Sequence, residues 1–207
     1  EGDEIDDANY KFNQFCININ YEFQNSEMVL LANEIRNFKN FLEQFSLNFF
    51  DNTSLISQNN IQNILFELLQ PNQSYEFLFS SISLINNLLF SCSDISFLFC
   101  ENQFLQLLCS NFTIFAGIIR SEHIKALSAI LRETDNSIHC FILSLLPVDL
   151  IYKTMNLNSN DDKLVGNSLN FLIGISMFLT PPEVTEILLL TGNEYISRYP
   201  SLCLKIF

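Results

Sequence analysis

Two histidines are the residues of this chain best suited to acid or base catalysis. One of them, His139, is followed by Cys140, a possible nucleophile. Adjacent residues on a helix point about 100° apart, so these two side chains cannot pair directly as nucleophile and base. His139 lies in an apolar run and is predicted to be a core or boundary residue, whereas His123 is predicted at the surface. We therefore expect no catalytic residues.

Motifs that hold a metal ion or a cofactor are missing from the sequence. It contains no HExxH, GxGxxG, GxSxG or P-loop motif, and its five glycines do not cluster. The pair Asp161-Asp162 predicts a turn and a helix start, because a hard cation needs several convergent oxygens. We expect no metal site, no cofactor and no enzymatic activity.

The charged residues restrict the class of partner. The formal net charge is −13, and no Lys or Arg occurs between Lys39 and Arg120. Nucleic acids and anionic membrane surfaces both require clustered cations, so both are disfavoured as partners. A protein or peptide partner fits this charge, a basic one included. An acidity that serves only solubility fits it equally well.

The cysteines and the N-terminus indicate the compartment. Six cysteines form no CxxC pair, and most lie in apolar stretches, which is typical of buried free thiols in a reducing compartment. No signal peptide pattern is present, so we expect a cytoplasmic protein, with the nucleus as the alternative. The uncharged residues 164–182 include polar residues and end at Pro181-Pro182, which favours a buried helix over a membrane span.

A hexapeptide with helical patterning recurs four times along the chain. The copies are FLEQFS, LINNLL, ALSAIL and FLIGIS. Their fourth residues are separated by 43, 42 and 45 residues, and these are Gln44, Asn87, Ala129 and Gly174. A period of about 40–47 residues is typical of helical solenoids, whose units bury their apolar faces by stacking.

Each period predicts a short helix, a second helix and a long third helix. In the clearest period, apolar residues at i, i+3, i+4 and i+7 predict a helix over residues 59–69, which Pro71 ends. Ser74 is predicted to cap a long helix that ends near residue 91. The following periods predict long third helices over residues 121–132 and 163–179.

This order of helices resembles the armadillo repeat, whose third helix carries a loose A-L-x-N-L-A pattern. LINNLL matches the pattern best and has its Asn at Asn87. The resemblance implies an all-α, right-handed α-solenoid of about four to five three-helix repeats, although HEAT repeats share the period. Residues 10–24 also alternate like a strand, but a helix is favoured there.

The resemblance implies a single solenoid over residues 10–207. An acidic disordered tail over residues 1–9 is predicted to precede it, because five of the first seven residues are acidic. The predicted repeats cover about 10–50, 51–93, 94–135 and 136–180, with a partial repeat over 181–207.

In armadillo proteins the third helices line a concave groove. Residues seven and four positions before the fourth residue of each hexapeptide share a helix face with it. A ladder of amides and hydroxyls there could hydrogen-bond a partner's backbone, although ordinary solvated helix faces would have the same pattern. The predicted groove residues are Asn37, Asn40, Gln44, Ser80, Ser83, Asn87, Glu122, Lys125, Asn167 and Asn170.

These observations favour a protein–protein interaction module that binds a partner segment along this groove. The alternative is a structural or regulatory segment of a larger complex, which would use its convex face or its apolar C-terminal end, residues 202–207. An importin-α-like adaptor for basic peptides is least favoured. Such adaptors have a Trp four residues before the groove Asn, where this chain has Ser83.

Overall fold

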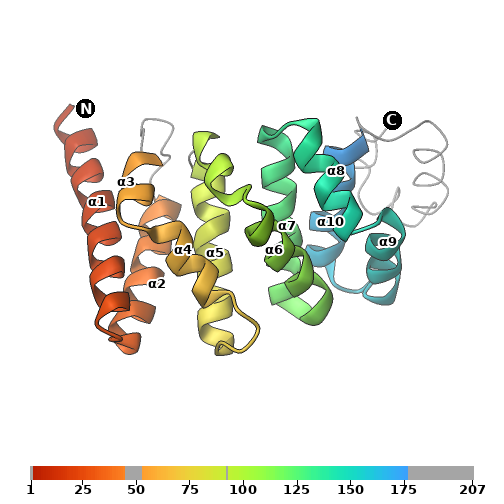
Figure 1. Ribbon diagram of the computed structural model, residues 1–207, viewed down its shortest axis with the longest axis horizontal. Coiled ribbons are helices and arrows are strands. Elements are labelled where there is room, and N and C mark those ends of the chain that lie inside the picture. Colours follow the sequence, from red (N-terminus) through yellow and green to blue (C-terminus); the bar gives the residue numbers. More distant parts are fainter. Residues whose placement is uncertain (1, 45–52, 92, 177–207) are drawn as a thin grey trace. The chain divides into compact units, whose positions relative to one another are not determined.

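The computed structural model describes residues 2–44, 53–91 and 93–176. Within these residues all regular secondary structure is helical, with ten α-helices and one 3-10 helix, so the predicted all-α class is confirmed (Figure 1). The chain divides into two compact units, residues 1–107 (unit 1) and residues 108–207 (unit 2).

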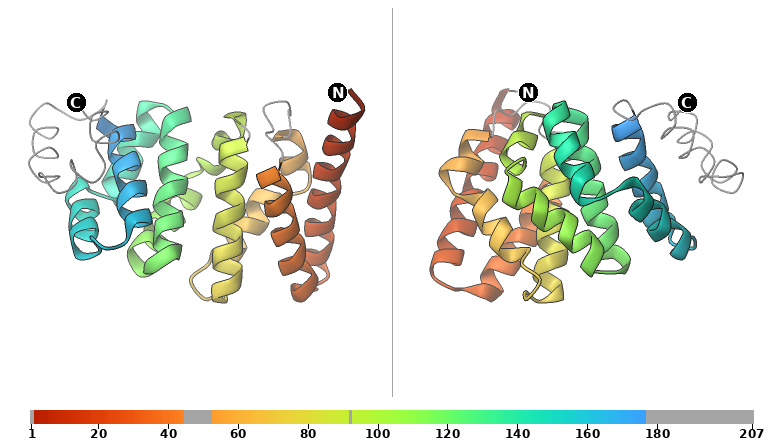
Figure 2. Two further views of the ribbon diagram at one scale, coloured as in Figure 1. Left: turned by 180° about the vertical axis from the view of Figure 1, so that it is seen from behind. Right: turned by 45° about the vertical axis from the view of Figure 1, so that its right-hand side comes forward.

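Unit 1 begins with two long antiparallel helices. The elements within it are α1 (Gly2–Gln24), α2 (Met28–Gln44), α3 (Thr53–Gln58), α4 (Ile61–Leu68), α5 (Tyr75–Ser91) and the 3-10 helix η1 (Ser93–Phe99). Helices α1, α2 and α5 lie side by side, with α2 in the middle, and α3 and α4 lie behind them in the left view of Figure 2.

Aromatic rings fill the space between α1 and α2. Phe12 and Phe38 are fully buried, with ring centroids 4.9 Å apart in an edge-to-face arrangement. Phe15 stacks on Phe38 with a centroid distance of 5.1 Å. Burying each such ring contributes roughly 1.5–3 kcal/mol. The abundant phenylalanines of the sequence therefore act here as core residues.

Unit 2 is built around two long helices that pack closely together. The division between the units falls within α6 (Asn102–Ile114). The remaining elements are α7 (Gly117–Glu133), α8 (Asn136–Leu145), α9 (Val148–Leu157) and α10 (Asp162–Ser176). A Cβ atom added at Gly174 on α10 would lie 3.4 Å from Cβ of Leu131 on α7. A methyl group at Gly174 would thus be in van der Waals contact with α7, which shows how closely the two helices pack.

The helices occur in the predicted order. A short helix, a second helix and a long helix recur as α3–α4–α5, η1–α6–α7 and α8–α9–α10. The predicted cap of α5 is also present, because the backbone N–H of Phe77 donates to Ser74 Oγ. Helix α8 begins with a cap of the same kind, in which the N–H groups of Ser137 and Ile138 donate to Asp135.

The N-terminus differs from the prediction. Residues 1–9 were predicted to be a disordered tail, but α1 includes the chain from Gly2 onward. The ion pair of Asp7 with Lys11, four residues later and 2.7 Å away, supports helical structure at this end of the chain. The predicted partial repeat over 181–207 lies outside the described residues.

Candidate binding surface

The predicted groove residues of α2 are exposed to solvent. Asn37, Asn40 and Gln44 are exposed, and Asn33 extends their row by one more turn toward the start of the helix. Steps of four, three and four residues place all four side chains on one face. The structure shows no hydrogen bond from any of these amides to another described residue. We call these four residues the α2 amide row.

Ion pairs border the α2 amide row on the side of α5. Arg36 Nη2 lies 2.6 Å from Oε1 of Glu76, an exposed pair that joins α2 to α5. Lys39 Nζ lies 3.5 Å from Oε1 of Glu43 one turn along the same helix. Both cations next to the row are therefore neutralised by carboxylates. The row itself carries no charge.

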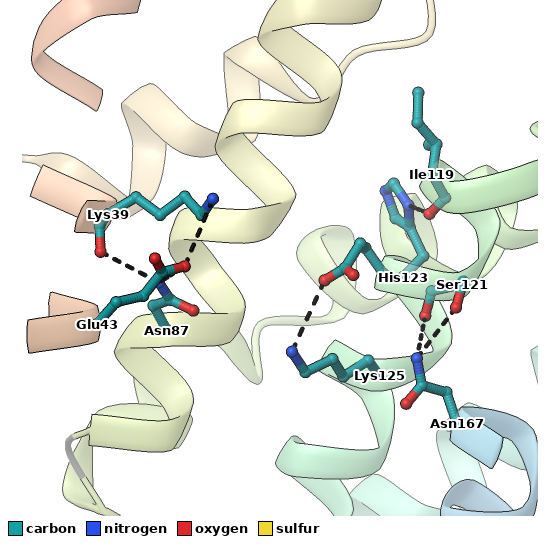
Figure 3. A network of polar contacts seen from close by, with 9 residues as sticks. Lys39, Glu43, Asn87, Ile119, Ser121, His123, Lys125 and Asn167 are labelled. Carbon is teal, nitrogen blue, oxygen red and sulfur yellow. Dashed lines mark hydrogen bonds and ion pairs between the residues drawn. The ribbon is translucent and has the colours of Figure 1, made fainter. Parts of the chain in front are cut away.

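Asn87 is not part of an open surface. It is half-buried, and its Nδ2 donates to the backbone oxygen of Lys39 at 3.2 Å and to Glu43 at 3.3 Å (Figure 3). Beside it on α5, Ser80 is half-buried and Ser83 is only 5% exposed. The residue that best matches the armadillo pattern thus uses its amide to hold α5 against α2.

Unit 2 contains a second bridge of the same kind. Nδ2 of Asn167 on α10 lies 3.1 Å from both the backbone oxygen and Oγ of Ser121 on α7 (Figure 3). Ser121 is fully buried. The two bridges join residues 44 to 48 positions apart, close to the period of the hexapeptides. An amide on one long helix therefore fastens it to the preceding long helix of its own unit.

The other predicted residues of unit 2 do not form an amide ladder. Glu122 is half-buried, and one of its carboxylate oxygens lies 3.9 Å from Nζ of the exposed Lys125 (Figure 3). Asn170 is exposed at the end of this series, and Ala129 is buried. The structure thus brings Asn37, Asn40 and Gln44 together on one exposed face. The remaining candidates are divided among bridges, an ion pair, buried or half-buried serines and the separate exposed residue Asn170.

His123 is buried, so its predicted surface position was wrong. Its Nδ1 lies 2.7 Å from the carbonyl oxygen of Ile119 and its Nε2 lies 3.2 Å from Nδ2 of Asn111. A carbonyl can only accept, so Nδ1 carries the proton and Nε2 accepts from the amide. Burial lowers the pKa of His123 to about 4, and the bond to Ile119 opposes this shift only in part. The ring is therefore a neutral structural group.

His139 also lies in the interior, as predicted. It is 2% exposed, and its Nε2 donates to the backbone oxygen of Leu131 at 2.8 Å. The adjacent Cys140 is exposed. The two side chains thus lie in different environments, one facing the interior and one facing solvent.

No group of three His, Cys, Asp or Glu residues in the described part of the chain could hold a metal ion. No single helix among the described residues is long and apolar enough to cross a membrane. Helices α8 and α9, with a bend of 56° between them, reach that length and apolar composition only when they are counted together.

The apolar C-terminal end over residues 202–207, which the alternative hypothesis uses, lies outside the described residues. No protein-family model matches this chain, and no curated protein or solved structure matches it either.

Proposed function

We propose that this chain is a non-enzymatic protein–protein interaction module and that the α2 amide row binds the backbone of a partner segment. The observation that carries the proposal is the row itself: Asn33, Asn37, Asn40 and Gln44 are exposed on one face of α2. An armadillo-like solenoid remains the architecture that we propose for the complete chain.

The chemistry of the row suits a peptide backbone. Each amide side chain offers both a donor and an acceptor, which complement the C=O and N–H groups of an extended chain. From Asn33 to Gln44 the row extends about 16 Å along the helix axis, since each residue rises about 1.5 Å. An extended segment of about five residues has the same length.

The charge of unit 1 favours a basic partner segment. Residues 1–107 contain three Lys or Arg against 14 Asp or Glu, a formal charge of −11. Each of the three cations is paired with a carboxylate, Lys11 with Asp7 and the other two beside the row. An approaching cationic segment would meet an attractive field that no unpaired cation of unit 1 offsets.

The environment of the histidines supports a function without catalysis. Both ring nitrogens of His123 face uncharged groups, and the pKa of about 4 keeps the ring uncharged at neutral pH. General acid–base catalysis needs a group that titrates near the working pH and reaches the substrate. A fully buried ring does neither.

The test is partner capture from the source cell with the full chain as bait, followed by titration of the captured partner. We expect Asn37→Ala/Asn40→Ala to weaken binding by about tenfold or more, as loss of contacts at the centre of an interface commonly does. The melting temperature should stay within about 2 °C of the original, because exposed side chains contribute little to stability.

Helix α6 offers a matched control. Gln103 and Gln106 are exposed amides, also three residues apart on a helix of unit 1. Gln103→Ala/Gln106→Ala should leave binding unchanged. Equal affinity of both double variants for the partner would refute the row as the binding surface.

A further inference from the structure

Helix α1 carries a second apolar stripe in addition to the one that it buries. Tyr10, Ile17 and Tyr21 are 67%, 44% and 66% exposed. Separations of seven and four residues place the three on one face, and Gln14 lies between them on the same face. We call these four residues the α1 stripe.

The α1 stripe points away from the core of unit 1. The buried residues of α1 are Ala8, Phe12, Cys16 and Ile19, which lie on the opposite side of the helix. Helix α1 contacts α2, α3 and α4, and Figure 1 shows these three helices on one side of α1. The rings of Tyr10 and Tyr21 therefore remain largely exposed in unit 1 and would bury a large area if covered.

Carboxylates border the stripe on the side of α2. Glu22 follows Tyr21 on α1, and Glu34 on α2 accepts a hydrogen bond of 2.7 Å from Asn18 of α1. Glu27 lies in the connection between the two helices. Burial raises the pKa of Glu22, and repulsion from Glu34 and Glu27 raises it further. Among the described residues no Lys or Arg forms an ion pair with any of these three carboxylates.

We propose that the α1 stripe binds an amphipathic helix of a partner protein, with apolar residues against Tyr10, Ile17 and Tyr21 and with Lys or Arg toward Glu22, Glu27 and Glu34. The proposal goes beyond the proposed function, because it uses a different helix face and does not depend on the α2 amide row.

The spacing and the charge select this partner. Positions separated by four and seven residues form the seam along which two helices pack. Exposed tyrosine rings accept both apolar side chains and the cations of Lys and Arg. A second copy of the chain is a poor fit, because it would bring a second unit of charge −11 against the first. A basic helix relieves the repulsion among the three carboxylates.

The experiment is a selection with a displayed library of helical peptides that have a fixed leucine seam and randomised flanks. The bait is the full chain, and peptides that also bind Tyr10→Ser/Tyr21→Ser are removed. We expect the remaining peptides to be enriched in Lys and Arg on one flank. The strongest of them is then titrated by fluorescence polarisation.

Tyr10→Ser/Tyr21→Ser should weaken this peptide by about tenfold or more, and Glu22→Gln/Glu27→Gln by about threefold with a flatter salt dependence. Tyr75→Ser is the matched control, since Tyr75 is a tyrosine of unit 1 that is 62% exposed and lies on α5. Circular dichroism should show unchanged helicity in all variants.

Three outcomes would overturn the proposal. The selection could yield no peptide that depends on the stripe. It could yield stripe-dependent peptides whose flanks are uncharged or acidic. Sedimentation could show that the chain forms a dimer that Tyr10→Ser/Tyr21→Ser dissociates, in which case the occupant is a second copy.

Discussion

Helix α2 of unit 1 and helix α7 of unit 2 each include the fourth residue of a repeated hexapeptide, but they differ in where their polar residues lie. On α2, four amides are exposed on one face. The matching positions of α7 hold the half-buried Glu122, the exposed Lys125 and the buried Ala129. The exposed amide row of α2 is therefore not repeated on α7, where polar side chains such as Ser121 and His123 are buried instead.

The difference shows what decides whether a polar residue of such a repeat is buried or exposed. On α7, the buried polar groups have partners on other helices, Asn167 for Ser121 and Asn111 for His123. Helix α10 lies close to α7, since a Cβ atom at Gly174 would be only 3.4 Å from Leu131. On α2, the α5 amide that reaches across is Asn87, and it bonds to Lys39 and Glu43 at the edge of the row. The exposed face of α2 is left free.

The largest predicted difference between the two units is the loss of unfolding free energy in mild acid. The pKa of His123 is about 4 in the folded chain against 6.5 for an ordinary histidine, so the unfolded state binds the proton more readily. Above pH 6.5 the neutral His123 ring therefore lowers the unfolding free energy of unit 2 very little. As the pH falls from 6.5 toward 4, the unfolding free energy decreases. Between pH 7 and pH 5 unit 2 should lose about 2 kcal/mol of unfolding free energy.

Buried thiols allow each unit to be followed separately. Cys16 is buried in unit 1 and Cys109 in unit 2, so their labelling rates report the opening of each unit. The raised pKa of Glu22 acts in the opposite direction, because its folded form takes up a proton more readily and gains stability as the pH falls. His123→Gln should abolish most of the acid loss at Cys109. An equal acid loss at Cys16 would contradict the assignment to unit 2.

Removing the bridge in unit 2 should have the next largest effect. Asn167→Ala should lower the unfolding free energy by about 1–2 kcal/mol, because it leaves the buried hydroxyl of Ser121 without this donor. Asn170→Ala, at an exposed position three residues further on α10, should cost less than about 0.5 kcal/mol. Urea unfolding followed at Cys109 measures both. Similar losses for the two variants would mean that the bridge contributes nothing.

The bridge in unit 1 should contribute less, since its acceptors lie on the half-buried Lys39 and the exposed Glu43, whereas Ser121 in unit 2 is fully buried. Asn87→Ala should cost about 1 kcal/mol, observed as faster labelling of Cys16. Asn40→Ala should leave that rate unchanged and should affect partner binding instead. If Asn40→Ala destabilises unit 1 as much as Asn87→Ala does, the α2 amide row has a structural role.

The two glycines of α10 provide the finest test of the close approach in unit 2. A Cβ atom at Gly166 would have nothing within 4 Å, so Gly166→Ala should stabilise the helix by about 0.5–1 kcal/mol. Gly174→Ala should give a smaller gain, because its Cβ atom would lie 3.4 Å from Leu131. Denaturation midpoints compare the two. A larger gain at Gly174 would show that a methyl group fits between α7 and α10 without a steric cost.

Much of the local structure could be predicted from the sequence. Ser74 caps the start of α5 as predicted, and α5 ends at Ser91 as its pattern indicated. The signals for these features lie within a few residues of each other. The role of Asn87 could not be predicted in this way, because its partner at Lys39 is 48 residues away.

The same limit applies to the buried polar residues. His123 lies among polar and charged residues in the sequence, which is typical of a surface position. Only its contact with Asn111 on another helix explains its burial. Asn33 was missed for a simpler reason, since it lies one turn before the positions that the repeat alignment marked. Continuing the four-three-four spacing toward the start of α2 would have included it.

The length of chain between the bridged residues also has a consequence for synthesis. Asn87 emerges 48 residues after Lys39, and Asn167 emerges 46 residues after Ser121. At about 5–20 residues per second, each earlier helix waits roughly 2–9 seconds on the ribosome for the helix that fastens it. During that interval α1, which is made before α2, can already cover part of the apolar side of α2. The aromatic contacts of Phe12 and Phe15 with Phe38 therefore protect α2 before Asn87 has emerged.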